Sequence, residues 1–85
     1  MKNSPYFIWD YDISEQDIRR FLTKGSETEK QWAIARIMEH AHFRDVFDYL
    51  SLQDIVTYLP KIKIRPVMRQ YWQRALITWG YPIHV

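Results

Sequence analysis

The chain has 85 residues, which is enough for one domain and too few for two. It contains no cysteine, and this excludes a disulfide scaffold and thiolate chemistry. No apolar run is long enough for a signal peptide or a membrane span, so we expect a cytoplasmic protein. A domain of this size buries a smaller fraction of its surface than a larger one, and four Trp, six Tyr and four Phe residues supply large side chains to fill its core.

Charge is distributed unevenly along the chain, although the net charge is only +2. Residues 1–54 carry 10 acidic and 7 basic side chains. The acidic excess of this part is followed by a basic excess in residues 55–85. This indicates that the C-terminal part faces an anionic partner, either a nucleic acid or an acidic protein surface. Residues 55–85 carry no acidic side chain and five basic ones: Lys61, Lys63, Arg65, Arg69 and Arg74.

The N-terminal stretch, residues 5–12, is dense in aromatic side chains and begins with proline, which argues against an α-helix. We predict that residues 1–13 form an extended arm, in which alternate side chains point to opposite sides. Phe7, Trp9 and Tyr11 then share one side. Either Phe7 and Trp9 pack as a lid over the helices of the same chain, or the arm docks on another protein or on a second copy.

The rest of the chain predicts helices with well-marked starts. Ser14, Ser26 and Ser51 each precede apolar residues at helical spacing and are followed three residues later by an acidic residue, as in a capping box. Pro66 suits the first position of a helix. We expect an all-α fold, a compact bundle of about five short helices within residues 14–80, and then a tail. The predicted helices cover 14–25, 26–42, 43–50, 51–59 and 66–80, and the tail covers 81–85.

Apolar spacing predicts which sides of these helices are buried. The helix over 26–42 is apolar around most of its surface and is expected to lie at the centre. The helix over 43–50 is predicted from the helical spacing of its apolar residues Phe43, Val46, Phe47 and Leu50. The predicted inward positions of the last helix are Val67, Met68, Tyr71, Trp72, Ala75, Leu76 and Trp79.

Patterns typical of enzymes and metal sites are weak. The three serines with a clear context act as helix caps, and neither glycine belongs to a phosphate-binding loop. The sequence EHAH, residues 39–42, offers two imidazoles, but neighbouring helical residues diverge and no cysteine completes a zinc site. These histidines better suit a helix C-terminus, where a cation is favoured. We therefore expect a non-enzymatic protein without a metal or cofactor.

The basic segment, residues 61–74, is the strongest electrostatic candidate. Charged and apolar residues alternate over 61–65, which predicts an extended linker with Ile62 and Ile64 inward and the cations outward. Cations in this arrangement can contact phosphates, as those of helix-turn-helix proteins do. The candidate nucleic-acid-binding residues are Lys61, Lys63, Arg65, Arg69 and Arg74.

Three stretches together resemble a family of small prokaryotic all-α proteins. They are FIWDYD (residues 7–12), ARIMEH (residues 35–40) with its continuation to Phe47, and RQYW (residues 69–72). Members of that family start with an aromatic-Trp-Asp-x-Asp pattern and are often encoded beside nucleotidyltransferase-type toxins of abortive-infection systems. The resemblance implies an antitoxin-like or accessory-partner role.

Two functional hypotheses follow. The first is a protein-binding module, an antitoxin-like partner of a nucleotidyltransferase-type toxin, in which the arm anchors the partner and the basic edge of the last helix meets an acidic surface. The second is a DNA-binding transcriptional regulator that uses the basic segment. A homodimer with exchanged arms is a further arrangement. The candidate partner-binding residues are Trp9, Asp10, Asp12, Arg65 and Arg69.

Overall fold

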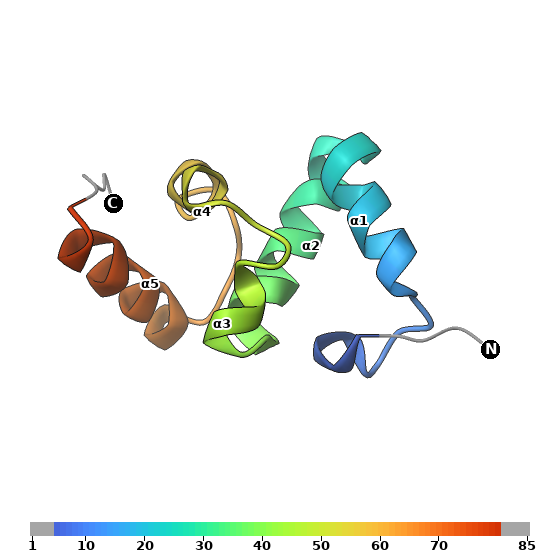
Figure 1. Ribbon diagram of the computed structural model, residues 1–85, viewed down its shortest axis with the longest axis horizontal. Helices are drawn as coiled ribbons and strands as arrows, with labels where there is room; N and C mark the ends of the chain where they lie inside the picture. Colours follow the sequence, from blue (N-terminus) through green and yellow to red (C-terminus); the bar gives the residue numbers. More distant parts are fainter. Residues whose placement is uncertain (1–4, 81–85) are drawn as a thin grey trace.

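The computed structural model describes residues 5–80, which form five α-helices and one short 3-10 helix (Figure 1). The predicted all-α fold of five short helices is confirmed. The predicted tail, residues 81–85, and the first four residues of the predicted arm lie outside the described residues. Within the described part, no helix is long and apolar enough to cross a membrane. The elements are η1 (Tyr6–Ile8), α1 (Glu15–Lys24), α2 (Glu27–His40), α3 (Phe43–Val46), α4 (Leu52–Tyr58) and α5 (Pro66–Thr78).

Local capping fixes the starts of four helices, as predicted. The side chains of Ser14, Ser26 and Ser51 each accept a hydrogen bond from the backbone N–H three residues later. The acidic side chain at that later position accepts a bond from the serine N–H in return. Each box satisfies two donors that the helix cannot satisfy itself. α5 begins with Pro66, whose missing N–H is not needed at the first helical position.

α2 lies at the centre of an elongated molecule that measures 41 × 23 × 20 Å along its principal axes (Figure 1). η1 and α1 lie on one side of it and α3, α4 and α5 on the other. Four side chains of α2 are buried, Ala33, Ile34, Ile37 and Met38, which confirms its predicted central place. The other buried side chains are Phe7, Ile8, Ile18, Val46, Leu50, Ile55, Leu59, Ile62, Trp72 and Leu76.

The N-terminal segment is not extended as predicted, because Tyr6–Ile8 form one turn of 3-10 helix. This turn buries two consecutive side chains, Phe7 and Ile8, whereas Trp9 is 66% exposed. The lid interpretation is therefore right for Phe7 and wrong for Trp9. An extended chain sends neighbouring side chains to opposite sides, but a helical turn can place both of them against the core.

Tyr6 ties this turn to the junction between α2 and α3. Its hydroxyl donates to Asp45 Oδ2 at 2.6 Å and accepts from the N–H of His42 at 2.6 Å. Burial, together with the bond to Asp45, raises the pKa of the Tyr6 phenol. The aromatic segment is thus held on its own chain by polar bonds as well as by Phe7 and Ile8.

Two predicted helix ends differ from the structure. α2 ends at His40, because Ala41 has extended backbone and His42 becomes the N-cap of α3. α3 has only four residues, and turns follow it as far as Tyr49. The bend at Ala41 lets α3 fold back beside α2.

The linker between α4 and α5 starts as a turn and becomes extended only after it. The N–H groups of Lys61 and Ile62 both donate to the carbonyl of Tyr58, at 2.8 and 3.1 Å. Ile62 is buried and Ile64 packs against the core, as predicted from the alternation.

Trp72 joins α5 to the end of α2. The last four carbonyls of an α-helix have no N–H partner within the regular helix. In α2, the carbonyl of Ile37 accepts from the N–H of Ala41, and that of Met38 accepts from the indole Nε1–H of Trp72 at 2.9 Å. Because Trp72 is 1% exposed, water cannot replace this bond.

We expect Trp72→Phe to lower the free energy of unfolding by about 1–3 kcal/mol, because the Met38 carbonyl then stays buried without a donor. Urea denaturation followed by circular dichroism measures this loss. The matched control is Trp9→Phe, the same chemical change on a ring that is 66% exposed. Equal losses for the two variants would contradict the role given to the indole bond.

Tyr49 links the turn after α3 to α1. Its hydroxyl donates to Glu15 Oε1 at 2.9 Å, and the guanidinium carbon of Arg19 lies 4.7 Å from its ring centroid. Burial raises the pKa of Tyr49 to about 12, and the hydrogen bond and charge of Glu15 add to the shift.

We expect the free energy of unfolding to fall as the pH rises from about 10, the ordinary pKa of tyrosine, towards the folded-state pKa of Tyr49. Over this range the unfolded chain loses the Tyr49 proton while the folded chain keeps it, so rising pH favours unfolding. Urea denaturation at about pH 8 and about pH 11 should show a smaller loss for Tyr49→Phe than for the wild type. Some loss remains in the variant, because the pKa values of Tyr6 and Tyr58 are also raised. An identical loss in both proteins would exclude Tyr49 as a source.

Candidate functional site

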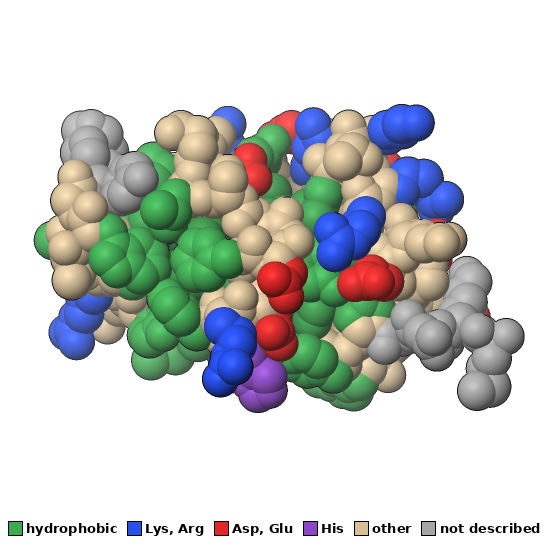
Figure 2. Space-filling view, viewed as in Figure 1, with side chains coloured by type: hydrophobic (Ala, Val, Ile, Leu, Met, Phe, Trp, Pro, Cys, Tyr) green, Lys and Arg blue, Asp and Glu red, His purple; other side chains and the backbone are tan. Residues whose placement is uncertain are grey.

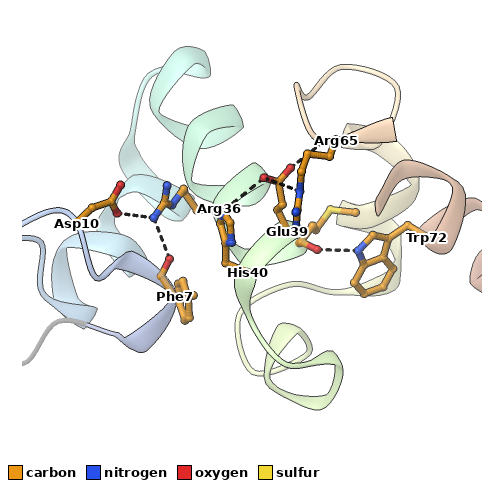
Figure 3. Close-up of polar contacts among 8 residues, drawn as sticks. Phe7, Asp10, Arg36, Glu39, His40, Arg65 and Trp72 are labelled. Carbon is orange, nitrogen blue, oxygen red and sulfur yellow. Dashed lines mark hydrogen bonds and ion pairs between the residues drawn. The ribbon is translucent and has the colours of Figure 1, made fainter. Parts of the chain in front are cut away.

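Arg36 on α2 holds the N-terminal segment. Its Nη2 donates to Asp10 Oδ1 at 2.5 Å and to the carbonyl of Phe7 at 3.2 Å (Figure 3). Its guanidinium carbon also lies 4.8 Å from the ring centroid of Trp9, a distance typical of cation–π attraction. The Arg36 side chain is only 17% exposed, so these partners compensate a charge that would otherwise be buried alone.

The predicted partner-binding residues of the N-terminal segment have different surroundings. Asp10 is paired with Arg36 and therefore contributes to the fold. Trp9 is exposed, and its ring meets that of His40 edge to face, with centroids 4.9 Å apart. Asp12 is exposed and has no ion pair within residues 5–80. Of the three predicted residues, Trp9 and Asp12 thus remain available to a partner.

Two of the predicted binding cations have partners inside the chain. The Arg69 guanidinium donates to the carbonyls of Leu59 and Ile62, and so it completes the end of α4 and the turn after it. The N–H of Arg65 donates to Glu39 Oε2 at 2.8 Å, and its Nε lies 3.5 Å from Glu39 Oε1 (Figure 3). The negative charge of Glu39 lies at the start of α5, where it interacts favourably with the positive end of the helix dipole. Arg69 is therefore a structural residue, and Arg65 keeps a 60% exposed side chain beside a carboxylate.

The other three predicted cations do not form one continuous track. The Nζ of Lys61 lies 5.4 Å from the ring centroid of Tyr58. Lys63 lines a groove beside Trp32 of α2, and Arg74 lines a different groove on α5. All three are exposed, and none has an ion pair within the described part of the chain.

A partly exposed aromatic surface lies over α3 and α5, and it includes Tyr71 and Trp79, which the apolar spacing assigned to the core. It is formed by four aromatic side chains of α3 and α5 or of the residue that follows each helix. Neighbouring rings touch, with centroids 5.4 Å apart for Phe43–Phe47 and 5.7 Å for Phe43–Trp79. Figure 2 shows hydrophobic side chains gathered over these helices, at the left of the view. We call the four residues the α3–α5 aromatic face: Phe43 (40% exposed), Phe47 (38%), Tyr71 (47%) and Trp79 (40%).

α5 carries two separate apolar rows, and the sequence pattern does not distinguish them. Trp72 and Leu76 form the row that enters the core. The second row begins with Val67, continues with Tyr71, repeats every four residues and lies along another side of the helix. A spacing of four residues identifies a row but not the direction in which it faces. The inward prediction for the last helix is confirmed for Trp72 and Leu76 and is wrong for Val67, Tyr71 and Trp79.

The aromatic face rests on the buried ring of Trp72. Phe43 stacks on this ring with centroids 5.4 Å apart and planes inclined by 21°. Tyr71 and Phe47 meet it edge to face, at 5.7 and 6.3 Å. Because Trp72 is itself fixed by the bond to Met38, the exposed rings have defined positions.

A groove of about 520 Å³ runs along α5 beside this face. Apolar and aromatic side chains make one wall, and polar side chains of α5 make the other. Among its described lining residues there is no carboxylate, and Arg74 is the one charged side chain. The lining residues are Phe43, Val67, Gln70, Tyr71, Arg74, Ala75, Thr78 and Trp79.

The histidines of the EHAH sequence have structural surroundings. His40 Nε2 lies 3.4 Å from Glu39 Oε1, an ion pair when the imidazole is protonated. His42 is the N-cap of α3. Within residues 5–80, no three His, Asp or Glu side chains come together in a way that would hold a metal ion.

Comparison of this chain with models of protein families, with curated proteins and with solved structures finds no match.

Arg69→Ala should lower the free energy of unfolding by about 2–3 kcal/mol, because two carbonyls lose a charged donor. Arg74→Ala, a matched change five residues later on the same helix, should shift it by no more than about 0.5 kcal/mol. Chemical denaturation measures both values. If Arg69→Ala proved as mild as Arg74→Ala, Arg69 would return to the set of candidate binding residues.

Proposed function

We propose that this protein is a non-enzymatic protein-binding module that acts in the cytoplasm and contacts its partner through the α3–α5 aromatic face. The observation that carries the proposal is a set of four aromatic side chains, each 38–47% exposed, that pack on one another and on a buried Trp. Contiguous exposed apolar surface of this kind marks interaction sites. Tyr and Trp residues in particular supply much of the binding energy of protein interfaces.

The fixed positions of the rings support a binding role further. A side chain that must be ordered on binding costs about 0.5–1.5 kcal/mol of entropy. Phe43, Tyr71 and Trp79 are already held by ring contacts, so little of this cost remains. A preformed aromatic surface therefore favours association with another protein.

For the partner we propose a nucleotidyltransferase-type toxin, toward which this protein acts as an antitoxin-like or accessory protein. The support is the resemblance of residues 7–12, 35–47 and 69–72 to proteins encoded beside such toxins. A magnesium-dependent transferase presents clustered carboxylates, and the cation of Arg74 in the α5 groove is complementary to such a surface.

The competing proposal is a DNA-binding transcriptional regulator that uses residues 61–74. It has less support, because Arg69 is bonded to backbone carbonyls and because Lys63 and Arg74 line different grooves. Phosphate recognition depends on several cations that follow one backbone, and each contact adds to the salt dependence.

The test is co-expression of the tagged protein with the product of its neighbouring gene. We expect the two to co-purify and the growth defect caused by that product to be relieved. Tyr71→Gln should weaken the complex by about tenfold or more, as the loss of an interface hot spot does. Tyr11→Gln is the matched control, since Tyr11 is 49% exposed and Tyr71 47%, and should leave binding unchanged.

Three outcomes would contradict the proposal. The first is that no complex forms and growth is unchanged. The second is a complex that Tyr11→Gln breaks and Tyr71→Gln does not, which would place binding on the N-terminal segment. The third is binding to the operator DNA of its own gene that falls steeply with salt, with no protein complex, which would favour the regulator.

A further inference from the structure

We propose that the groove along α5 receives an amphipathic α-helix of the partner protein. Apolar side chains of that helix contact Val67, Tyr71 and Trp79, and an Asp or Glu side chain pairs with Arg74. This inference rests on the proposed function, since it names the kind of segment that the protein partner presents.

Two parallel rows of α5 side chains give the groove its form. Gln70, Arg74 and Thr78 make a polar row with a spacing of four residues, beside the apolar row. Rows of this spacing are the ridges between which the side chains of a second helix pack. The 13 residues of α5 extend over about 20 Å, which is enough for roughly three turns of a docked helix. The apolar row is Val67, Tyr71, Ala75 and Trp79.

A helix fits this groove better than a strand or a nucleic acid does. The described residues contain no β-strand, so they offer no edge for strand addition. Phe43 stands on the far side of the apolar row, 6.0 Å from Tyr71 and 5.7 Å from Trp79 between centroids, and completes a trough. Single-stranded nucleic acid binds to aromatic platforms accompanied by several cations, whereas this groove has one cation.

Arg74 determines the charge of the docked helix. It has no ion pair within the described residues, and the sequence holds no acidic residue after Asp54. A helix lying in the groove removes the guanidinium from water, which is costly unless a carboxylate pairs with it. Carboxylate–guanidinium pairs also fix geometry through two parallel hydrogen bonds. The fitting helix is therefore apolar on one side and carries Asp or Glu at its edge.

A second copy of this chain fits the groove less well. In a two-fold contact, each copy presents the same surface to the other. The described lining of the groove would then contribute a second Arg74 and no carboxylate. Two guanidinium groups would share a partly dry interface without an opposite charge.

The test begins with a displayed library of random peptides of about 16 residues, long enough for a helix-in-groove ligand. The library is selected on the wild-type protein and counter-selected on Tyr71→Gln. We expect the enriched peptides to carry apolar residues at helical spacing with an excess of Asp and Glu. Enrichment of Lys and Arg, or of peptides without helical spacing, would overturn the proposal.

A charge exchange then tests Arg74 itself. Arg74→Glu should weaken the selected peptide by about tenfold or more, and replacing the acidic residues of the peptide by Lys should restore binding to this variant. Lys63→Glu, an equal change of net charge in another groove, should have no effect. Fluorescence anisotropy of the labelled peptide gives the dissociation constants. An Arg74→Glu variant that binds as well as the wild type would overturn the pairing.

Two further measurements decide between occupants. If sedimentation equilibrium shows a dimer that Tyr71→Gln abolishes, a second copy of this chain occupies the groove and the proposed partner helix is wrong. If labelled oligothymidylate binds the wild type and loses affinity in Tyr71→Gln, nucleic acid occupies the groove and the proposed partner helix is wrong.

If the co-expressed partner requires Tyr71 but the selected peptides lack the predicted pattern, this inference fails and the proposed function stands. If the pattern appears but no co-expressed complex forms, the proposed toxin partner fails and the preference of the groove stands.

Discussion

The structure depends on the hydrogen bond between the Trp72 indole and the Met38 carbonyl, at the point where α2 stops. A helix end leaves carbonyls without donors, and this one lies in the core, where water cannot supply them. The indole meets that requirement and at the same time fills the space between α2 and α5. Glu39, the next residue, accepts from the N–H of Arg65 at the start of α5. Two adjacent residues of α2 therefore set the position of α5, and Arg36, one turn earlier, sets that of the N-terminal segment (Figure 3).

The same ring couples stability to the proposed binding surface. The indole N–H of Trp72 donates to α2, while its ring stacks with Phe43 and makes edge-to-face contacts with Tyr71 and Phe47. The exposed rings have defined positions because they pack on Trp72, which cannot move without disrupting the core. In a small domain with few buried residues, the same side chain, Trp72, both fills the core and supports the exposed rings. A change that loosens Trp72 should therefore disturb folding and binding together, whereas changes to Tyr71 act on the surface.

Helix starts could be predicted from the sequence because capping is local. Ser14, Ser26 and Ser51 bond to residues three positions away, and no other part of the chain is needed to explain them. The direction of the apolar rows on α5 is a property of the whole fold, so spacing alone could not separate Trp72 from Tyr71. The structural role of Arg69 was hidden for a similar reason, because its acceptors are backbone carbonyls and leave no pattern in the side chains. Phe7 and Ile8 show a third limit: a single 3-10 turn is too short to produce any periodicity.

The structure shows which cations of residues 55–85 face solvent, and the net charge of this segment does not. Arg69 is used inside the fold and Arg65 lies beside Glu39, so the number of cations overstates what a partner meets. Arg74 differs from these, because it lines a groove in which the described lining residues include aromatic rings and no acidic side chain. A cation in such a place adds little affinity in itself, but it penalises any partner that brings no carboxylate. In the proposed complex, the aromatic rings can then supply the affinity while Arg74 selects for a partner helix that carries a carboxylate.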